Sequence, residues 1–277
     1  MNYDTTDIAE RYDTARHLSD RTMRAWFDAI KSRIPSGEIR RVLDVGCGTG
    51  RFSTRLAQEF DADVIGIDPA ETMLAKARTN KTDSRVAFLL GVAEDLPVSD
   101  NSVCLAYLSM VYHHLGEPRQ AFGEFNRVLR DAGFLCIRNS TLELLDQVPY
   151  LTYFPSALLY NRSRLPSQRG VINTGEQSGF SLVSHTVIEQ EFATSMEEYS
   201  AKISKRALSD LAALPDAEFA AGLRRMSEAH DQSKVLLPIV EPIDLFIFRK
   251  ATRLGPNLSL NRTASSGRPA APAGTAG

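Results

Sequence analysis

The stretch VLDVGCGTGRF, residues 42–52, places three glycines at alternate positions directly after a short apolar run. Such a run is typical of a buried strand, and glycines at its end form a loop whose backbone a ligand can approach closely. A tight turn would account for one glycine, but hardly for Gly46, Gly48 and Gly50 together. We therefore expect a ligand-binding loop between the first strand of an open α/β sheet and the helix that follows it.

Strand-like and helix-like segments alternate from residue 41 to residue 139, which is the pattern of a parallel sheet covered by helices. The segments RVAFLLG (85–91) and SVCLAYLSM (102–110) are nearly continuous apolar runs. Because strands buried on both faces read in this way, both are predicted to lie in the middle of the sheet. Two further strands are expected at residues 180–192 and 243–250.

One α/β domain with additions accounts for the chain length of 277 residues. Residues 1–38 are predicted to form an N-terminal helical lid, and residues 39–254 the main domain. This domain carries cap insertions at about 140–175, which shows no clean period and is interpreted as irregular, and at 194–235, where two helices are expected. From residue 255 to residue 277 small residues and proline dominate, which predicts a disordered tail.

Composition excludes several classes of protein. With 32 basic and 34 acidic residues the net charge is −2, which argues against a nucleic-acid partner. No apolar stretch is long enough to span a membrane, and the polar N-terminus is unlike a signal peptide, so a cytoplasmic protein is expected. The three cysteines have no metal-ligand spacing, so no metal is expected. The oligomeric state stays open.

The segment LDVGCGTG, residues 43–50, resembles motif one of the class I S-adenosylmethionine-dependent methyltransferases. A dinucleotide-binding loop would need its third glycine at position 51, where the chain has arginine. The segments AYLSMVYHHL (106–115) and FNRVLRDAGFLCI (125–137) resemble the branch that includes ubiquinone and menaquinone biosynthesis C-methyltransferases. The resemblance implies a Rossmann-like, doubly wound sheet of seven strands, mostly parallel with the last strand antiparallel. It also implies S-adenosyl-L-methionine as cofactor and S-adenosyl-L-homocysteine as product.

The same resemblance assigns a cofactor site. Asp44 would position the loop or hold the cofactor's amino group, and Asp68 would accept hydrogen bonds from both ribose hydroxyls, with capping of the next helix as its other interpretation. Met73 would pack on the adenine or simply in the core. The adenine edge would contact Ala93 and Glu94, and the methionine end Tyr12 and Arg16. The full predicted set is Tyr12, Arg16, Asp44, Gly46, Gly48, Gly50, Asp68, Met73, Ala93, Glu94 and Met110.

Methyl acceptors need positioning and, for some atoms, a base. His113 follows the fourth strand, where the methyl group should lie, and is a candidate general base or a packing residue. Arg138 could bind an anionic acceptor or a surface carboxylate. Tyr150, Tyr153 and Phe154 could line an aromatic acceptor site or pack within the cap.

These observations predict methylation of an enclosed small molecule at O, N or C, as in secondary metabolism. Protein or RNA methylation is an alternative, although residues 109–112 read SMVY where enzymes that methylate flipped bases carry an Asn/Asp-Pro-Pro-Tyr signature. A non-catalytic partner subunit that binds S-adenosylmethionine is a further alternative. Arg51 disfavours a nicotinamide-dependent oxidoreductase, and the isolated cysteines disfavour metalloid methylation.

Overall fold

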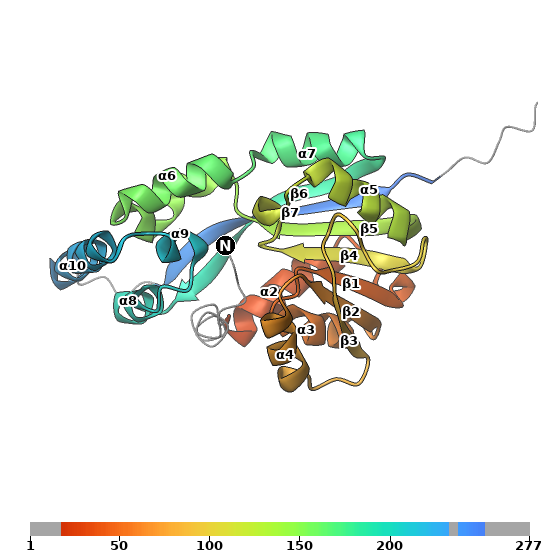
Figure 1. The fold of residues 1–277 in the computed structure, drawn as a ribbon, viewed down its shortest axis with the longest axis horizontal. Coiled ribbons are helices and arrows are strands. Elements are labelled where there is room, and N and C mark those ends of the chain that lie inside the picture. Colours follow the sequence, from red (N-terminus) through yellow and green to blue (C-terminus); the bar gives the residue numbers. More distant parts are fainter. Residues whose placement is uncertain (1–17, 233–237, 253–277) are drawn as a thin grey trace, which may run out of the picture.

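A computed structural model describes residues 18–232 and 238–252. Its centre is a seven-stranded sheet with the strand order β3-β2-β1-β4-β5-β7-β6 (Figure 1). The first five strands in the chain run parallel, β7 is antiparallel to β5, and β6 is antiparallel to β7. The predicted fold class is thereby confirmed. The strands are β1 (Arg41–Val45), β2 (Asp63–Asp68), β3 (Val86–Leu90), β4 (Val103–Ser109), β5 (Leu129–Asn139), β6 (Phe180–Ala193) and β7 (Ile239–Lys250).

Helices cover both faces of the sheet, as Figure 1 shows. One face packs against α2 (Asp20–Lys31), α3 (Arg51–Phe60) and α4 (Glu71–Asn80) through a core that includes Trp26 and Leu56. The other face packs against α5 (Pro118–Val128) and α7 (Gln168–Gln177). Ser19 caps α2, because its side chain accepts a hydrogen bond from the backbone amide of Thr22.

The position of β3 corrects one expectation from the sequence. The strand lies at the edge of the sheet, beyond β2, and not in its middle. Leu89 and Leu90, at the end of the strand, are 39% and 57% exposed. The apolar run therefore includes residues that are not buried in the fold. An apolar run alone does not distinguish a central strand from an edge strand whose outer side is open. The other segment of this kind, β4, does lie in the middle of the sheet and is buried along most of its length.

The insertion predicted as irregular is mostly helical. It contains η3 (Leu142–Gln147), η4 (Pro149–Thr152) and α6 (Pro155–Arg164), and it ends in α7. Pro149 and Pro155 each stand at the start of a helix, where the missing N–H costs nothing. The insertion is thus built from short helices, two of which begin at a proline. The breaks between these helices interrupt the regular repeat of apolar residues by which a helix is recognised in a sequence.

A cap extends beyond the end of the sheet (Figure 1). Its elements are η3, η4, α6, α8 (Met196–Ser204), α9 (Ser209–Ala212) and α10 (Asp216–Gln232). They share a separate hydrophobic core that contains Phe154, Tyr199 and Met226. Since α7 packs on the sheet instead, only the first part of the insertion at 140–175 contributes to the cap.

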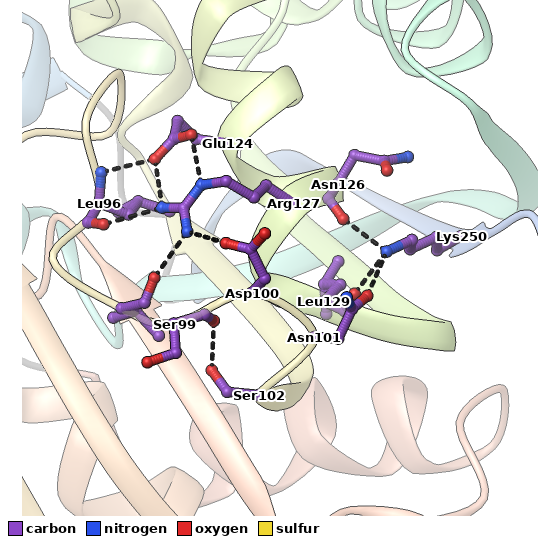
Figure 2. Close-up of polar contacts among 11 residues, drawn as sticks. Leu96, Ser99, Asp100, Asn101, Ser102, Glu124, Asn126, Arg127, Leu129 and Lys250 are labelled. Carbon is purple, nitrogen blue, oxygen red and sulfur yellow. Dashed lines mark hydrogen bonds and ion pairs between the residues drawn. The ribbon is translucent and has the colours of Figure 1, made fainter.

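Two basic side chains, Arg127 and Lys250, hold the segments around α5 together, as Figure 2 shows. Arg127 pairs with Glu124 at 2.6 Å and with Asp100 at 2.7 Å, and it donates to the carbonyl oxygen of Leu96. Lys250 is 3% exposed and donates to the carbonyl oxygens of Asn126 and Leu129, at the C-terminal end of α5. Carbonyls in a last helical turn lack helical partners, so Lys250 caps α5 and ties β7 to it.

Within the residues that the structure describes, no helix is long and apolar enough to cross a membrane. The same residues hold no group of three or more His, Cys, Asp or Glu side chains arranged to bind a metal ion. Cys47, Cys104 and Cys136 are buried and free. Tyr12 and Arg16, the start of the predicted lid, and the predicted tail from residue 255 lie outside the described residues.

Candidate active site

The glycine loop connects β1 to α3, and its three glycines have φ angles of 67°, 55° and 78°. This left-handed region is costly for other residues. A Cβ atom on Gly46 would lie 2.4 Å from Cγ2 of Val111, and one on Gly50 would lie 2.7 Å from Cζ of Phe88. A Cβ atom on Gly48 would meet no atom within 4 Å. Gly46 and Gly50 therefore allow close packing, whereas Gly48 faces open space.

Two adjoining hollows lie over this loop. Both are bordered by Gly46, Gly48, Ser109 and Met110, and we call them together the loop cavity. Asp44 and Phe52 border one hollow, and Asp68 and Met73 the other. The structure thus brings most of the predicted cofactor residues to one place at the carboxyl ends of the strands.

Asp44 is buried at the end of β1. Its Oδ2 atom accepts a hydrogen bond of 2.6 Å from the Ser53 hydroxyl in α3. Burial raises the pKa of Asp44 to about 7, against the opposing effect of the Ser53 hydrogen bond. Asp44 therefore fixes the start of α3 and can gain or lose its charge near neutral pH.

Asp68 ends β2 and holds two backbone amides. Its Oδ2 atom accepts from the Gly48 amide at 2.8 Å, and its Oδ1 atom accepts from the Ala70 amide at 2.9 Å. The N-cap of α4 is Ala70, so Asp68 does not cap this helix itself. It orders the turn before α4 and also borders the loop cavity. Met73 is likewise buried and borders the cavity at the same time.

Ala93 and Glu94 are absent from the walls of the loop cavity. Ala93 packs in the core on the α5 side of the sheet. The Oε1 atom of Glu94 accepts from the backbone amides of Gly116 and Glu117, at 2.9 Å and 3.3 Å, just before α5. Their contact with an adenine edge stays a prediction, whereas the structural role of Glu94 is evident.

Met110 occupies the junction of the whole site. It follows β4 with a φ of 60°, which is uncommon for a residue other than glycine. Its amide donates to the carbonyl oxygen of Arg138 at 2.7 Å, so the strained residue is fixed to β5. Met110 borders the loop cavity and also a second cavity beneath the cap.

The cavity beneath the cap, which we call the cap cavity, has about 790 Å³ of space not filled by protein atoms, part of it open to solvent. His113, Arg138 and Tyr150, which the sequence analysis predicts as acceptor residues, border it, and their contact with an acceptor stays a prediction. Tyr153 does not border the cavity, and Phe154 is fully buried and stacked on Phe219 in the cap core, with ring centroids 5.7 Å apart. The polar wall residues that sequence reasoning missed are Arg51, Ser140, Asn161, Gln190, Ser209, Asp210 and Glu241.

Arg138 is 3% exposed and lies between two aromatic rings. Its guanidinium carbon is 4.6 Å from the centre of the Trp26 ring and 5.6 Å from that of Phe52. It donates to the Ser109 hydroxyl and to the side-chain oxygen of Gln190, which also accepts from the Trp26 indole. These contacts place a positive charge at the sheet end of the cap cavity and attach α2 to it.

The cap end of the cavity is acidic. Asp210 Oδ2 accepts hydrogen bonds of 2.7 Å from the Tyr150 hydroxyl and from the Asn161 amide. Tyr199 donates to Glu241 and accepts from the Tyr150 backbone amide. Burial, reinforced by the charges of Asp210 and Glu241, raises the pKa of Tyr150 well above its ordinary value. Tyr150 therefore remains protonated and acts as a hydrogen-bond donor.

The sequence of this chain is similar to those of known proteins. A sequence profile described as a methyltransferase domain matches residues 43–137. Over 187 residues the chain is 30% identical to an O-methyltransferase of Aspergillus nomiae, covering 66% of this chain and 80% of that protein. The chain belongs to the class I S-adenosylmethionine-dependent methyltransferases.

Other members of the family match a shorter region. An uncharacterized methyltransferase of Mycobacterium tuberculosis is 40% identical over 108 residues, which are 39% of this chain and 42% of that protein. This chain therefore spans less than half of that relative's length. A ubiquinone/menaquinone biosynthesis C-methyltransferase of Dinoroseobacter shibae is 32% identical over 138 residues, 48% of this chain and 55% of that protein. The relatives of this methyltransferase thus include a member of the branch that its sequence motifs indicate.

A solved structure shows the same fold. It is that of a putative methyltransferase from an antibiotic biosynthesis pathway of Anabaena variabilis, and it covers 82% of this chain and 97% of its own, with a TM-score of 0.65 and 20% identity. At 20% identity this similarity shows that the two proteins share a fold, and it supports no more specific conclusion.

Proposed function

We propose that this chain transfers a methyl group from S-adenosylmethionine to a small-molecule acceptor, at oxygen, nitrogen or carbon. The observation that carries the proposal is the position of Met110, which borders both the loop cavity and the cap cavity. A donor over the glycine loop and an acceptor beneath the cap would meet at this residue. Positioning of two reactants in this way is the main contribution that methyl transfer needs from a protein.

The loop cavity fits the donor. Gly48 leaves open space for a ligand against the backbone, and Asp68 offers its carboxylate at the end of β2. Asp44, near the methionine end in this assignment, would attract an ammonium group when ionised. When bound, S-adenosylmethionine supplies a methyl group already activated by a sulfonium. Phe52 and Met110 would exclude water from the methyl group.

The walls of the cap cavity favour a small polar molecule as the methyl acceptor, of the kind found in secondary metabolism. Cap elements supply part of the cavity wall, whereas a protein substrate would need an open groove. Charged walls at both ends fit an acceptor with polar groups at both ends. Because the relative from Aspergillus nomiae is an O-methyltransferase, oxygen is the first acceptor atom to test, with His113 as the base.

Calorimetric titration with S-adenosylmethionine, S-adenosylhomocysteine and NAD tests the donor. Binding of the first two ligands and no binding of NAD is expected, and binding of NAD alone would overturn the assignment. Release of S-adenosylhomocysteine in the presence of a panel of phenols, carboxylic acids and amines then tests catalysis. Donor binding with no turnover on any acceptor, including proteins and RNA, would support a non-catalytic binding subunit.

A further inference from the structure

Asn139, the last residue of β5, is fully buried beside His113. Its side-chain nitrogen donates a hydrogen bond of 2.7 Å to the carbonyl oxygen of Ser140. A carbonyl oxygen only accepts hydrogen bonds, so this contact fixes which end of the amide is nitrogen. The side-chain oxygen of Asn139 then faces His113, with its Oδ1 atom 3.2 Å from Nδ1 of the ring.

This orientation decides the tautomer of the neutral imidazole. An amide oxygen can only accept, so Nδ1 of His113 must carry the hydrogen. A neutral imidazole has one N–H group, and Nε2 is therefore the nitrogen with the lone pair. Asn139 thus determines which nitrogen of the ring can take up a proton.

His113 lies where a proton acceptor is useful. It belongs to η2 (Tyr112–His114), directly after β4, and it borders the cap cavity together with Met110. Besides His113, the titratable or charged groups around this cavity are Arg51, Arg138, Tyr150, Asp210 and Glu241. The centroid of the His114 ring lies 4.1 Å from that of His113. The site therefore holds fixed charges of both signs around one imidazole.

We infer that Asn139 is a positioning residue that prepares Nε2 of His113 as the general base for an acceptor that loses a proton, such as a hydroxyl compound. The inference rests on the proposed methyl transfer. The O–H proton passes to Nε2 while an oxygen electron pair forms the bond to the methyl carbon, and the carbon–sulfur bond breaks with its electron pair left on sulfur. A thiolate or tertiary amine has no such proton to lose and would not need this arrangement.

The first test is the tautomer itself, which requires no turnover. In protein labelled with 15N-histidine, long-range 15N–1H correlation spectra at pH 8 distinguish a protonated ring nitrogen from one with a lone pair. The chain has five histidines, so the H113Q variant identifies the signals of His113. Wild-type protein is expected to show hydrogen on Nδ1 and a lone pair on Nε2. Hydrogen on Nε2 in the wild type would overturn the inference.

The second test separates positioning from folding. Asn139→Leu, with Asn139→Ala in reserve, should yield Nε2-protonated His113 and reduce kcat for a hydroxyl acceptor about tenfold. The dissociation constant of S-adenosylhomocysteine should be unchanged by calorimetry. Unchanged kcat in a folded variant would contradict the inference. If the wild type binds the donor but methylates nothing, the proposed function fails while the tautomer measurement remains valid.

Discussion

The Asp68 carboxylate and the Gly48 amide are joined by a hydrogen bond of 2.8 Å, so the end of β2 holds the middle of the glycine loop. The other carboxylate oxygen accepts from the Ala70 amide at the start of α4. One side chain thus shapes the loop, orders the turn before α4 and borders the loop cavity. Its substitution must therefore be tested for both shape and binding.

Asp68→Ala should weaken S-adenosylmethionine binding by roughly 2 kcal/mol, because it removes a charged acceptor of hydrogen bonds. Calorimetry measures this loss, with Asp63→Ala, an exposed position in the same strand, as the matched control. To separate ribose binding from loop shape, S-adenosylhomocysteine is compared with its 2′-deoxy analogue. The wild type should prefer the ribose form and the variant should not. An equal preference in both proteins would refute the ribose assignment.

Gly46→Ala and Gly48→Ala should fail in different ways. A Cβ atom at position 46 would clash with Val111, so this variant should lose about 2 kcal/mol or more of unfolding free energy. A Cβ atom at position 48 meets no protein atom within 4 Å, so only the strain of its φ angle, about 1–2 kcal/mol, is added. Gly48→Ala should nevertheless bind the donor more weakly, because the added methyl group projects into the loop cavity. Urea unfolding measures the loss of stability in the two variants, and calorimetry measures their affinity for the donor. A larger stability loss in Gly48→Ala, together with normal donor binding, would contradict the assignment of Gly48 to the cavity wall.

The loop residues could be predicted from the sequence because their roles are local. Gly46, Gly48 and Asp44 lie within a few residues of one another, and their types follow from backbone freedom and the end of a strand. Asp68 required one further step, namely that parallel strands end at the same edge of the sheet. The family resemblance then named the ligand.

The cap could not be predicted in this way, because its polar contacts join distant segments. Tyr150 bonds Asp210 across 60 residues, and Trp26 bonds Gln190 across 164. No local pattern encodes such pairs. A signal existed in Glu241, an acidic residue among apolar ones at the start of β7, whereas Gln190 lies between Glu189 and Glu191 and does not stand out. The partners of both residues could come only from the three-dimensional structure.

Asp44 should make stability depend on pH. Its folded-state pKa of about 7 lies above its ordinary value of 3.8, so the folded protein binds this proton more tightly than the unfolded chain. The associated stability is fully present below about pH 4 and is lost as the pH rises through 7. The unfolding free energy of the wild type should fall relative to Asp44→Asn by up to roughly 4 kcal/mol between pH 4 and pH 8. Urea unfolding across this range measures the difference, and parallel curves for the two proteins would contradict the burial-raised pKa.

Gly222→Ala should damage the cap selectively. A Cβ atom there would lie 2.2 Å from Cε1 of Phe154, a ring fully buried in the cap core and too constrained to move freely. Overpacking of this kind costs about 1–3 kcal/mol. Gly123 in α5 is the matched control, because a Cβ atom there meets nothing within 4 Å, and Gly123→Ala should stabilise its helix by about 0.5–1 kcal/mol.

Hydrogen exchange locates the damage in the two variants. In Gly222→Ala, amides of α6, α8 and α10 should exchange faster, while those of β1 and β4 should keep their protection. Calorimetry should find S-adenosylhomocysteine bound as tightly as in the wild type, because the loop cavity is built on the sheet and not on the cap core. Turnover of a hydroxyl acceptor should fall, because η3, η4, α6 and α9 share the cap core with α10 and supply walls of the cap cavity. If donor binding fell together with turnover, the cap and the sheet would form one cooperative unit, and the division of the site into a donor half and an acceptor half would be wrong.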